Sequence, residues 1–318
     1  MTIDNNIETT KVEYGTTVQT DDTINQTVDA SVINSNTNVS DSKNKRAKGL
    51  SAAELQDPNN IEVSIIDKEA PLIILFGPPS CGKTMTLVRL TRYLRDVLGY
   101  TVTPIRSFRP SYDENYKDIC DNYTTLVNSN NAAESTDKIS FMLVGIIKEG
   151  RTICQILEAP GEYYFNPEDP NAQYPAYVNN IINGGNRKIW CMMVEPDWED
   201  QEDRRNYTNR IAKLKPRMKV KDKVVFVFNK IDLTPFVISP GNVKMNLAIK
   251  NVNDMYPGIF TPFKNVNPIT SLWKSYNCDF VPFQTGDYTQ STTGLKFDQG
   301  PDEYCEKLWN MLFSKIRG

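Results

Sequence analysis

The chain has 318 residues, a formal net charge of −3 and 39% hydrophobic residues, values typical of a globular protein with a sizeable core. The charge argues against a dedicated nucleic-acid binder, and the only basic cluster that stands out, residues 43–48, is typical of a solvated linker. The absence of histidine excludes His-based catalytic triads and removes the commonest zinc ligand.

The cysteines and the apolar runs bear on the compartment. The six cysteines show no metal-ligand spacing, and several lie in apolar runs, as buried thiols in a reducing compartment do. The N-terminus is not a signal peptide, and no apolar run is long enough to span a bilayer. We therefore predict a cytoplasmic protein with no intrinsic membrane anchor.

The N-terminal stretch differs in composition from the remainder of the chain. Residues 1–66 are rich in Asn, Thr, Ser and Asp, and their apolar residues show no sustained periodicity. Such a segment cannot bury enough surface to offset the entropy of ordering it. The sequence therefore predicts a disordered polar tail over 1–66, followed by one domain over 67–318.

Strands and helices alternate along this domain. The apolar run 72–76 predicts a buried strand, and the helix that follows, to residue 98, has leucines on one face and arginines on the other. Further strands are predicted over 101–106, 139–147, 152–157, 189–194, 224–228 and 280–283, and the strand over 280–283 is expected to be the last. Further helices are predicted near 116–127, in a segment that ends at 182, over 199–219, over 242–255 and after 301. The segments 139–147 and 152–157 form a hairpin signal. This order predicts a three-layer α/β fold with a mostly parallel sheet and one antiparallel hairpin.

The first strand leads into GPPSCGKT, which matches the Walker A pattern GxxxxGK[ST] of P-loop NTPases. Glycines permit a tight loop whose N–H groups face a phosphate at a helix N-terminus. The lysine adds charge at the outer phosphates, and the threonine hydroxyl suits Mg²⁺. The alternative is a Gly-Pro turn that matches by accident. The predicted phosphate-binding residues are Gly77, Pro78, Pro79, Ser80, Cys81, Gly82, Lys83 and Thr84.

A second motif, NKID, follows the apolar run 224–228 and contains Asn229, Lys230 and Asp232. An aspartate carboxylate can accept hydrogen bonds from the adjacent N1–H and N2–H donors of guanine, which adenine lacks. A polar strand-to-helix turn is the alternative. Because the motif comes after a phosphate loop and two strands, we predict that it binds guanine.

With EAPGE at 158–162 between them, these motifs occur in the order of the guanine-nucleotide boxes, and residues 70–318 resemble the Ras-like, TRAFAC-class P-loop GTPases. The resemblance implies a switch that binds GTP or GDP with Mg²⁺, in which GTP orders two loops that hydrolysis releases. It implies that Glu158 lies on the magnesium side, that Gly161 meets the γ-phosphate and that Thr285 contacts the base region.

Two features depart from the family pattern or leave a role open. Glu162 stands where many relatives have the glutamine that positions the attacking water, so the resemblance implies a catalytic pair, Lys83 and Glu162, with slow intrinsic hydrolysis. The metal-binding threonine of the first switch is best matched by Thr136, with Thr124 and Thr125 as alternates, and an ordinary loop hydroxyl remains open for each.

Two functions follow from these motifs. The first is a cytoplasmic switch that binds guanine nucleotide, slowly hydrolyses GTP and meets a protein effector or activator. The alternative is a nucleotide-bound adaptor or scaffold without hydrolysis. The NKID motif disfavours a third possibility, an ATP-driven P-loop enzyme. The altered second box resembles bacterial GTPase-like domains of regulatory or defence systems.

Overall fold

The computed structural model describes residues 50–128, 141–159, 161, 169, 171–196, 201–291 and 294–318. All of them belong to the unit Ser40–Gly318, one of the two compact units into which contacts between residues divide the chain. None of the helices within these residues combines the length and the apolar character needed to cross a bilayer.

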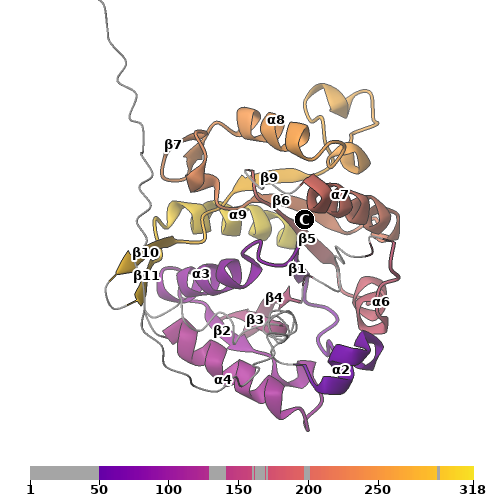
Figure 1. Ribbon diagram of the computed structural model, residues 1–318, viewed down its shortest axis with the longest axis vertical. Helices are drawn as coiled ribbons and strands as arrows, with labels where there is room; N and C mark the ends of the chain where they lie inside the picture. The colour runs from indigo at the N-terminus through magenta and orange to yellow at the C-terminus, as the bar shows by residue number, and fades with distance from the viewer. Residues whose placement is uncertain are drawn as a thin grey trace, which may run out of the picture. The chain divides into compact units, whose positions relative to one another are not determined.

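A seven-stranded sheet in the order β2-β3-β4-β1-β5-β6-β9 forms the centre of the domain (Figure 1). The strands are β1 (Leu72–Phe76), β2 (Thr101–Pro104), β3 (Met142–Lys148), β4 (Arg151–Glu158), β5 (Lys188–Val194), β6 (Lys223–Phe228) and β9 (Asp279–Pro282). Only β3 pairs antiparallel with its neighbours, β2 and β4. The predicted mostly parallel sheet with one antiparallel hairpin is therefore confirmed.

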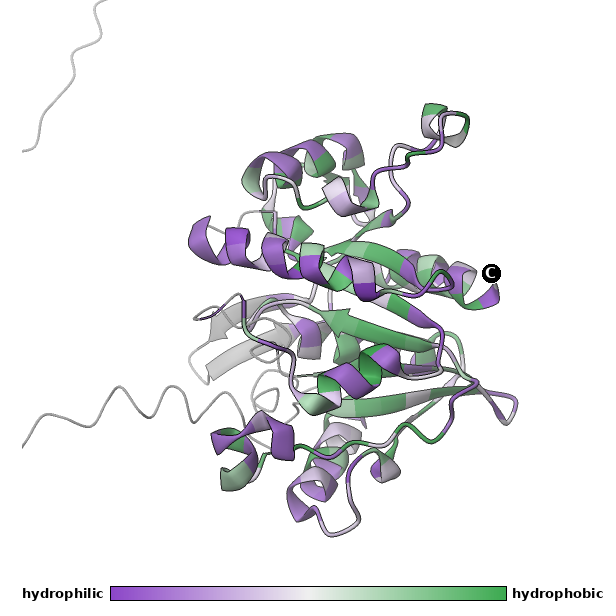
Figure 2. Cartoon of the chain, turned by 90° about the vertical axis from the view of Figure 1, so that its right-hand side faces the viewer, coloured by the Kyte–Doolittle hydropathy of each residue, from purple (hydrophilic) through white to green (hydrophobic). Residues whose placement is uncertain are grey.

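Helices cover both faces of this sheet. They are α3 (Lys83–Asp96), α4 (Glu114–Asn128), α6 (Ala176–Asn183), α7 (Gln201–Leu214), α8 (Met245–Met255) and α9 (Glu303–Arg317). In Figure 1, α3 and α9 pack together on one face, and α6 and α7 lie on the other. All five residues of β1 are buried between these layers, which explains its uninterrupted apolar run. Figure 2 shows hydrophobic residues concentrated on the strands.

Two small hairpins were not predicted. One joins β7 (Val237–Ser239) to β8 (Asn242–Val243), and the other joins β10 (Asp287–Ser291) to β11 (Gly294–Asp298). The prediction that 280–283 is the last strand is therefore wrong, and the helix expected from residue 242 begins at Met245. The β7–β8 sequence lacks the alternating apolar pattern by which a half-buried strand is recognised, whereas in β11 the apolar Leu295 and Phe297 do alternate with Lys296 and Asp298.

Residues 50–66 belong to the folded unit rather than to the tail predicted over 1–66. They contain α2 (Ala52–Gln56), and the side chains of Leu50 and Ile61 are buried. Ser51 and Glu54 cap α2 reciprocally, a capping box that is also a sequence signal for a helix start. The remainder of the predicted tail, up to residue 49, lies outside the described residues.

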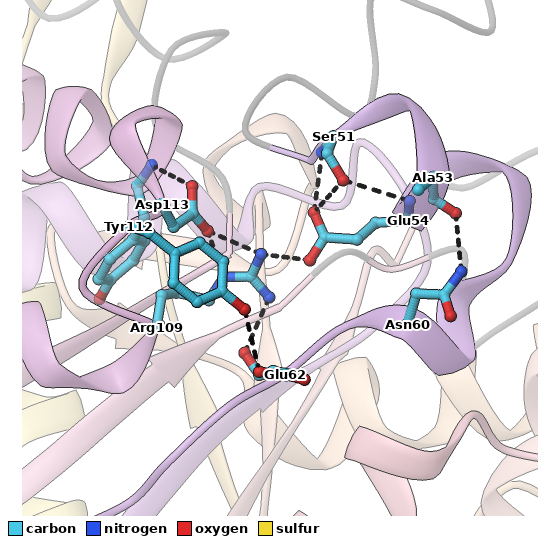
Figure 3. A network of polar contacts seen from close by, with 9 residues as sticks. Ser51, Ala53, Glu54, Asn60, Glu62, Arg109, Tyr112 and Asp113 are labelled. Carbon is cyan, nitrogen blue, oxygen red and sulfur yellow. Dashed lines mark hydrogen bonds and ion pairs between the residues drawn. The ribbon is translucent and has the colours of Figure 1, made fainter.

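A buried arginine ties this N-terminal stretch to the domain (Figure 3). The guanidinium of Arg109 forms ion pairs with Glu54 and Asp113 and donates a hydrogen bond to Glu62 O at 3.0 Å. It also lies over the ring of Phe141, 5.4 Å from its centroid. Burial would raise the pKa of the Glu54 carboxyl, but the hydrogen bonds from Ser51 and Arg109 and the charge of Arg109 outweigh it and lower that pKa.

Candidate functional site

The loop between β1 and α3 requires glycine at two positions. A β-carbon at Gly77 would lie 2.6 Å from Cys81 Sγ, and one at Gly82 would lie 2.3 Å from Asn229 Nδ2. Gly82 also takes a positive φ of 84° at the N-cap of α3, and Ser80 takes a φ of 64°. Left-handed residues of this kind let successive backbone N–H groups converge, as they do in anion-binding nests.

The ammonium group of Lys83 is held within this loop. Its Nζ donates hydrogen bonds to Pro78 O at 2.7 Å and to Gly77 O at 3.2 Å, and the residue is buried. Burial raises the pKa of the neighbouring Cys81 thiol, so that this side chain stays uncharged at neutral pH. Within the loop itself, Lys83 therefore carries the positive charge.

Two oxygen-bearing side chains predicted to bind metal lie together. The hydroxyl of Thr84 donates to Glu158 Oε1 at 3.2 Å, and Glu158 Oε2 accepts from the N–H of Phe141 at 2.8 Å. Glu158 ends β4, whose residues pair with β1 in parallel, and this register brings the carboxylate to the loop. A hydroxyl and a carboxylate are hard donors that fit Mg²⁺, which nucleotide sites also bind through phosphates and water. The described parts of the chain contain no group of three His, Cys, Asp or Glu placed to hold a metal.

The EAPGE segment touches the loop at Gly161. A β-carbon there would lie 2.7 Å from Lys83 Nζ and 2.8 Å from Gly77 O, so the approach requires glycine. Glu162 and Thr136 lie outside the described residues. The alternates Thr124 and Thr125 lie in α4 rather than in a loop, and the Thr124 hydroxyl donates to Cys120 O within that helix.

The NKID segment is joined to the loop by one hydrogen bond. Asn229, directly after β6, donates from Nδ2 to Cys81 O at 2.7 Å. Its Oδ1 is buried and has no hydrogen-bond partner in the described structure, so it can accept from a ligand or from water. Asp232 lies in the short 3₁₀ turn after Lys230, and the buried Thr285 follows β9 at the same sheet edge. These predicted residues therefore share one edge of the sheet.

Two supporting residues, Glu195 and Arg89, were not predicted from the sequence. Lys230 has a positive φ of 54°, and its Nζ pairs with Glu195 Oε2 at 2.7 Å, just after β5. Arg89, on α3, is buried and donates to Gln284 O and Pro301 O, which fixes the segment around Thr285 to the helix that follows the loop. Arg89 and Arg92 lie on the face of that helix opposite the leucines, and both are buried.

The strand order and the loop geometry together decide the fold class. The chain has a P-loop GTPase-like fold. The resemblance to Ras-like P-loop GTPases drawn from the sequence is confirmed at the level of the fold by this arrangement. No protein-family model matches the chain, and no curated protein matches it.

Solved structures similar to this chain include one protein that is named for GTP binding and two that were solved with a guanine nucleotide bound. Nucleolar GTP-binding protein 1 from Plasmodium falciparum is 16% identical with a TM-score of 0.36, and the match covers 80% of this chain and 94% of that one. The Ski7 GTPase-like domain from S. cerevisiae, bound to GDP and inorganic phosphate, is 10% identical with a TM-score of 0.41, and the match covers 78% of this chain and 50% of that one. Translation elongation factor SelB from Methanococcus maripaludis, in complex with the GTP analogue GppNHp, is 10% identical with a TM-score of 0.33, and the match covers 80% of this chain and 35% of that one. The fold rests on the topology and loop geometry above, since these scores are all low.

Proposed function

We propose that this chain is a cytoplasmic guanine-nucleotide-binding switch that slowly hydrolyses GTP to GDP and phosphate. The hydrogen bond from Asn229 to Cys81 O supports the proposal most directly, because it fixes the NKID segment to the phosphate loop. One nucleotide can then contact both segments, with its phosphates on the loop and its base at the NKID residues.

The phosphate end of the proposed site combines several donors. Backbone N–H groups of residues 77–84 and the Lys83 ammonium would bind the phosphate oxygens, and Gly161 lies close enough to the loop to add its own N–H. Thr84 and Glu158 would hold Mg²⁺, which neutralises charge that develops on the transferred phosphoryl group. Catalysis would then rest on positioning and charge stabilisation.

The base end of the proposed site rests on Asp232. Its two carboxylate oxygens would accept from the two adjacent donors of guanine, and Asn229 Oδ1 offers a further acceptor nearby. Lys230, between Asn229 and Asp232, has a left-handed backbone conformation and pairs with Glu195, and this turn would set the direction of the Asp232 carboxylate. Thr285 would contribute backbone contacts beside the base.

Replacing Asp232 by asparagine is expected to exchange the base preference. The change turns one acceptor into a donor, so GTP affinity should fall by about tenfold or more, and affinity for xanthosine triphosphate should rise. Titration calorimetry with GTP, xanthosine triphosphate and ATP measures all three. Asp254→Asn, at an exposed position of α8, is the matched control and should leave them unchanged. Equal affinity of the wild type for ATP and GTP would contradict guanine recognition.

Slow hydrolysis is the second expected property, and it depends on Glu162. A carboxylate in place of the usual glutamine repels the γ-phosphate, so turnover of the isolated chain should lie far below an ordinary rate of roughly 10 per second. A partner that supplies an arginine should raise it by about 10³ or more. Phosphate release, followed with GTP for the wild type and for Glu162→Gln, measures this rate.

The outcomes of this experiment separate the functions. Glu162→Gln should bind GTP as the wild type does and keep the basal rate. An ordinary enzyme rate that Glu162→Gln destroys would make Glu162 a general base. Bound GTP that persists unhydrolysed in both proteins would favour the alternative, a nucleotide-bound adaptor without turnover.

A further inference from the structure

Residues 264–278 form a loop between α8 and β9 that projects from the domain (Figures 1 and 2). The loop carries four exposed large apolar side chains, Val266 (90% exposed), Ile269 (68%), Leu272 (78%) and Trp273 (81%). Single exposed apolar residues need no explanation, but four within one short loop do. We call these four residues the apolar tip.

Hydrogen bonds at the base of the loop hold the tip away from the core. Asn265 N donates to Ser275 O at 2.9 Å, and Asn277 N donates to Phe263 O at 2.6 Å, so that the two arms of the loop are paired. Phe263 itself is buried in the core. The tip is therefore presented by an ordered support that leaves its apolar side chains in solvent.

A strongly basic surface adjoins the loop. A cavity of about 570 Å³ beside its base is lined by Lys215, Lys219, Lys223, Lys274 and Lys315, with Asp222, Asp279 and the carboxylate of Gly318 as the acidic groups. Lys274 belongs to the loop as well, which makes the two surfaces continuous. Residues 264–278 contain no acidic side chain.

Both acidic residues of this cavity are engaged internally. Asp279 is bound by Lys315 at 2.7 Å and by Lys274 at 3.1 Å, and Asp222 accepts from the N–H groups of Lys188 and Lys219. An excess of positive charge therefore remains on the lysines. Sequence patterns do not reveal this cluster, because its lysines come from segments as far apart as Lys215, Lys274 and Lys315.

One further exposed apolar side chain, Val220, lies beside these lysines. Val220 is fully exposed, lies between Lys219 and Lys221 in the turn before β6, and lines the same cavity. The cavity and the loop lie where β6 and β9 begin, whereas the phosphate loop follows the end of β1. Since these strands are parallel, the surface lies at the opposite end of the sheet from the proposed nucleotide site, and the inference does not depend on that site.

We propose that the apolar tip and the lysines beside it dock on the surface of an anionic lipid bilayer. Trp, Leu and Ile side chains on a narrow projection can enter the headgroup region, where tryptophan is favoured. The flanking lysines would then lie at the level of the lipid phosphates, which attract them. Charge complementarity favours this partner over a neutral one. The contact is peripheral and reversible, and it differs from the spanning anchor whose absence the sequence predicts.

Vesicle sedimentation of the full chain tests this proposal. Wild type should sediment with vesicles made of equal parts of phosphatidylcholine and phosphatidylserine, should not sediment with phosphatidylcholine alone, and should be released by salt. The double variant Leu272→Ser/Trp273→Ser should bind the anionic vesicles at least about tenfold more weakly, a change of about 1.4 kcal/mol. Lys219→Glu/Lys221→Glu should lose the binding similarly.

Matched controls distinguish this contact from nonspecific adsorption of the protein to vesicles. Ile66→Ser changes an apolar residue elsewhere that is 66% exposed, and Lys244→Glu/Lys307→Glu makes the same charge change near the β7–β8 hairpin. Both controls should bind like wild type, and thermal unfolding should show that all variants are folded. A wild type that stays in the supernatant with anionic vesicles overturns the proposal. Equal losses in the controls would overturn it too.

Discussion

Replacing Lys83 by alanine is expected to weaken GTP binding by about a hundredfold, or roughly 2.7 kcal/mol. The ammonium group is held in the phosphate loop by Pro78 O and Gly77 O, and neighbouring Cys81 is an uncharged thiol. Removing Lys83 therefore removes the positive charge of the loop at the position where phosphate charge would accumulate. Titration calorimetry in the presence of Mg²⁺ measures the loss.

Two comparisons make this result specific. Lys117→Ala removes an exposed lysine of α4 that pairs with Glu114, and it should leave GTP affinity unchanged. Thr84→Ala should weaken binding only when Mg²⁺ is present, because its hydroxyl is proposed to act through the metal. Unaltered GTP affinity in a folded Lys83→Ala protein would contradict the assignment of residues 77–84 as a phosphate loop.

The central fold and most of the site could be predicted because their signals are local. A buried parallel strand such as β1 is a continuous apolar run, and the residues that follow it must lie at the edge where parallel strands end. For this reason the strand pattern placed the phosphate loop and the NKID segment near one another, and the resemblance to P-loop GTPases added Glu158. The structure brings them together through the hydrogen bonds Thr84 to Glu158 and Asn229 to Cys81.

The buried arginines could not be predicted because their partners are distant in the sequence. Arg89 follows the polar side of a helical pattern, yet it is buried and donates to the carbonyls of Gln284 and Pro301. Hydrophobic periodicity assigns such a residue to the solvent-exposed face, because it uses only the polarity of each residue. It contains no information about a hydrogen-bond acceptor that is distant in the sequence. Arg109 is likewise buried against a partner distant in the sequence, Glu54. Their contact holds a segment whose polar composition, taken alone, predicts a disordered tail.

Replacing Arg109 by alanine is expected to lower the free energy of unfolding by about 3 kcal/mol. Its guanidinium is almost fully buried and pairs with Glu54 and Asp113, whose side chains are each 11% exposed (Figure 3). Loss of the arginine leaves two carboxylates in a poorly hydrated place without a cation. Urea unfolding measures the change. Arg106→Ala is the matched control, because its ion pair with Asp121 lies in solvent and should contribute little.

The same variant should change how stability depends on pH. The folded state lowers the pKa of Glu54, so its ion pair contributes fully above the ordinary pKa of glutamate, and the contribution is lost as pH falls through the lowered value. The difference in unfolding free energy between wild type and Arg109→Ala should therefore shrink as the pH falls from neutral to below about 4. Arg109→Ala/Glu54→Gln should recover part of the loss at neutral pH, since it removes one unpaired charge. A difference that stays constant with pH would show that Arg109 acts through its packing on Phe141, and not through its charge.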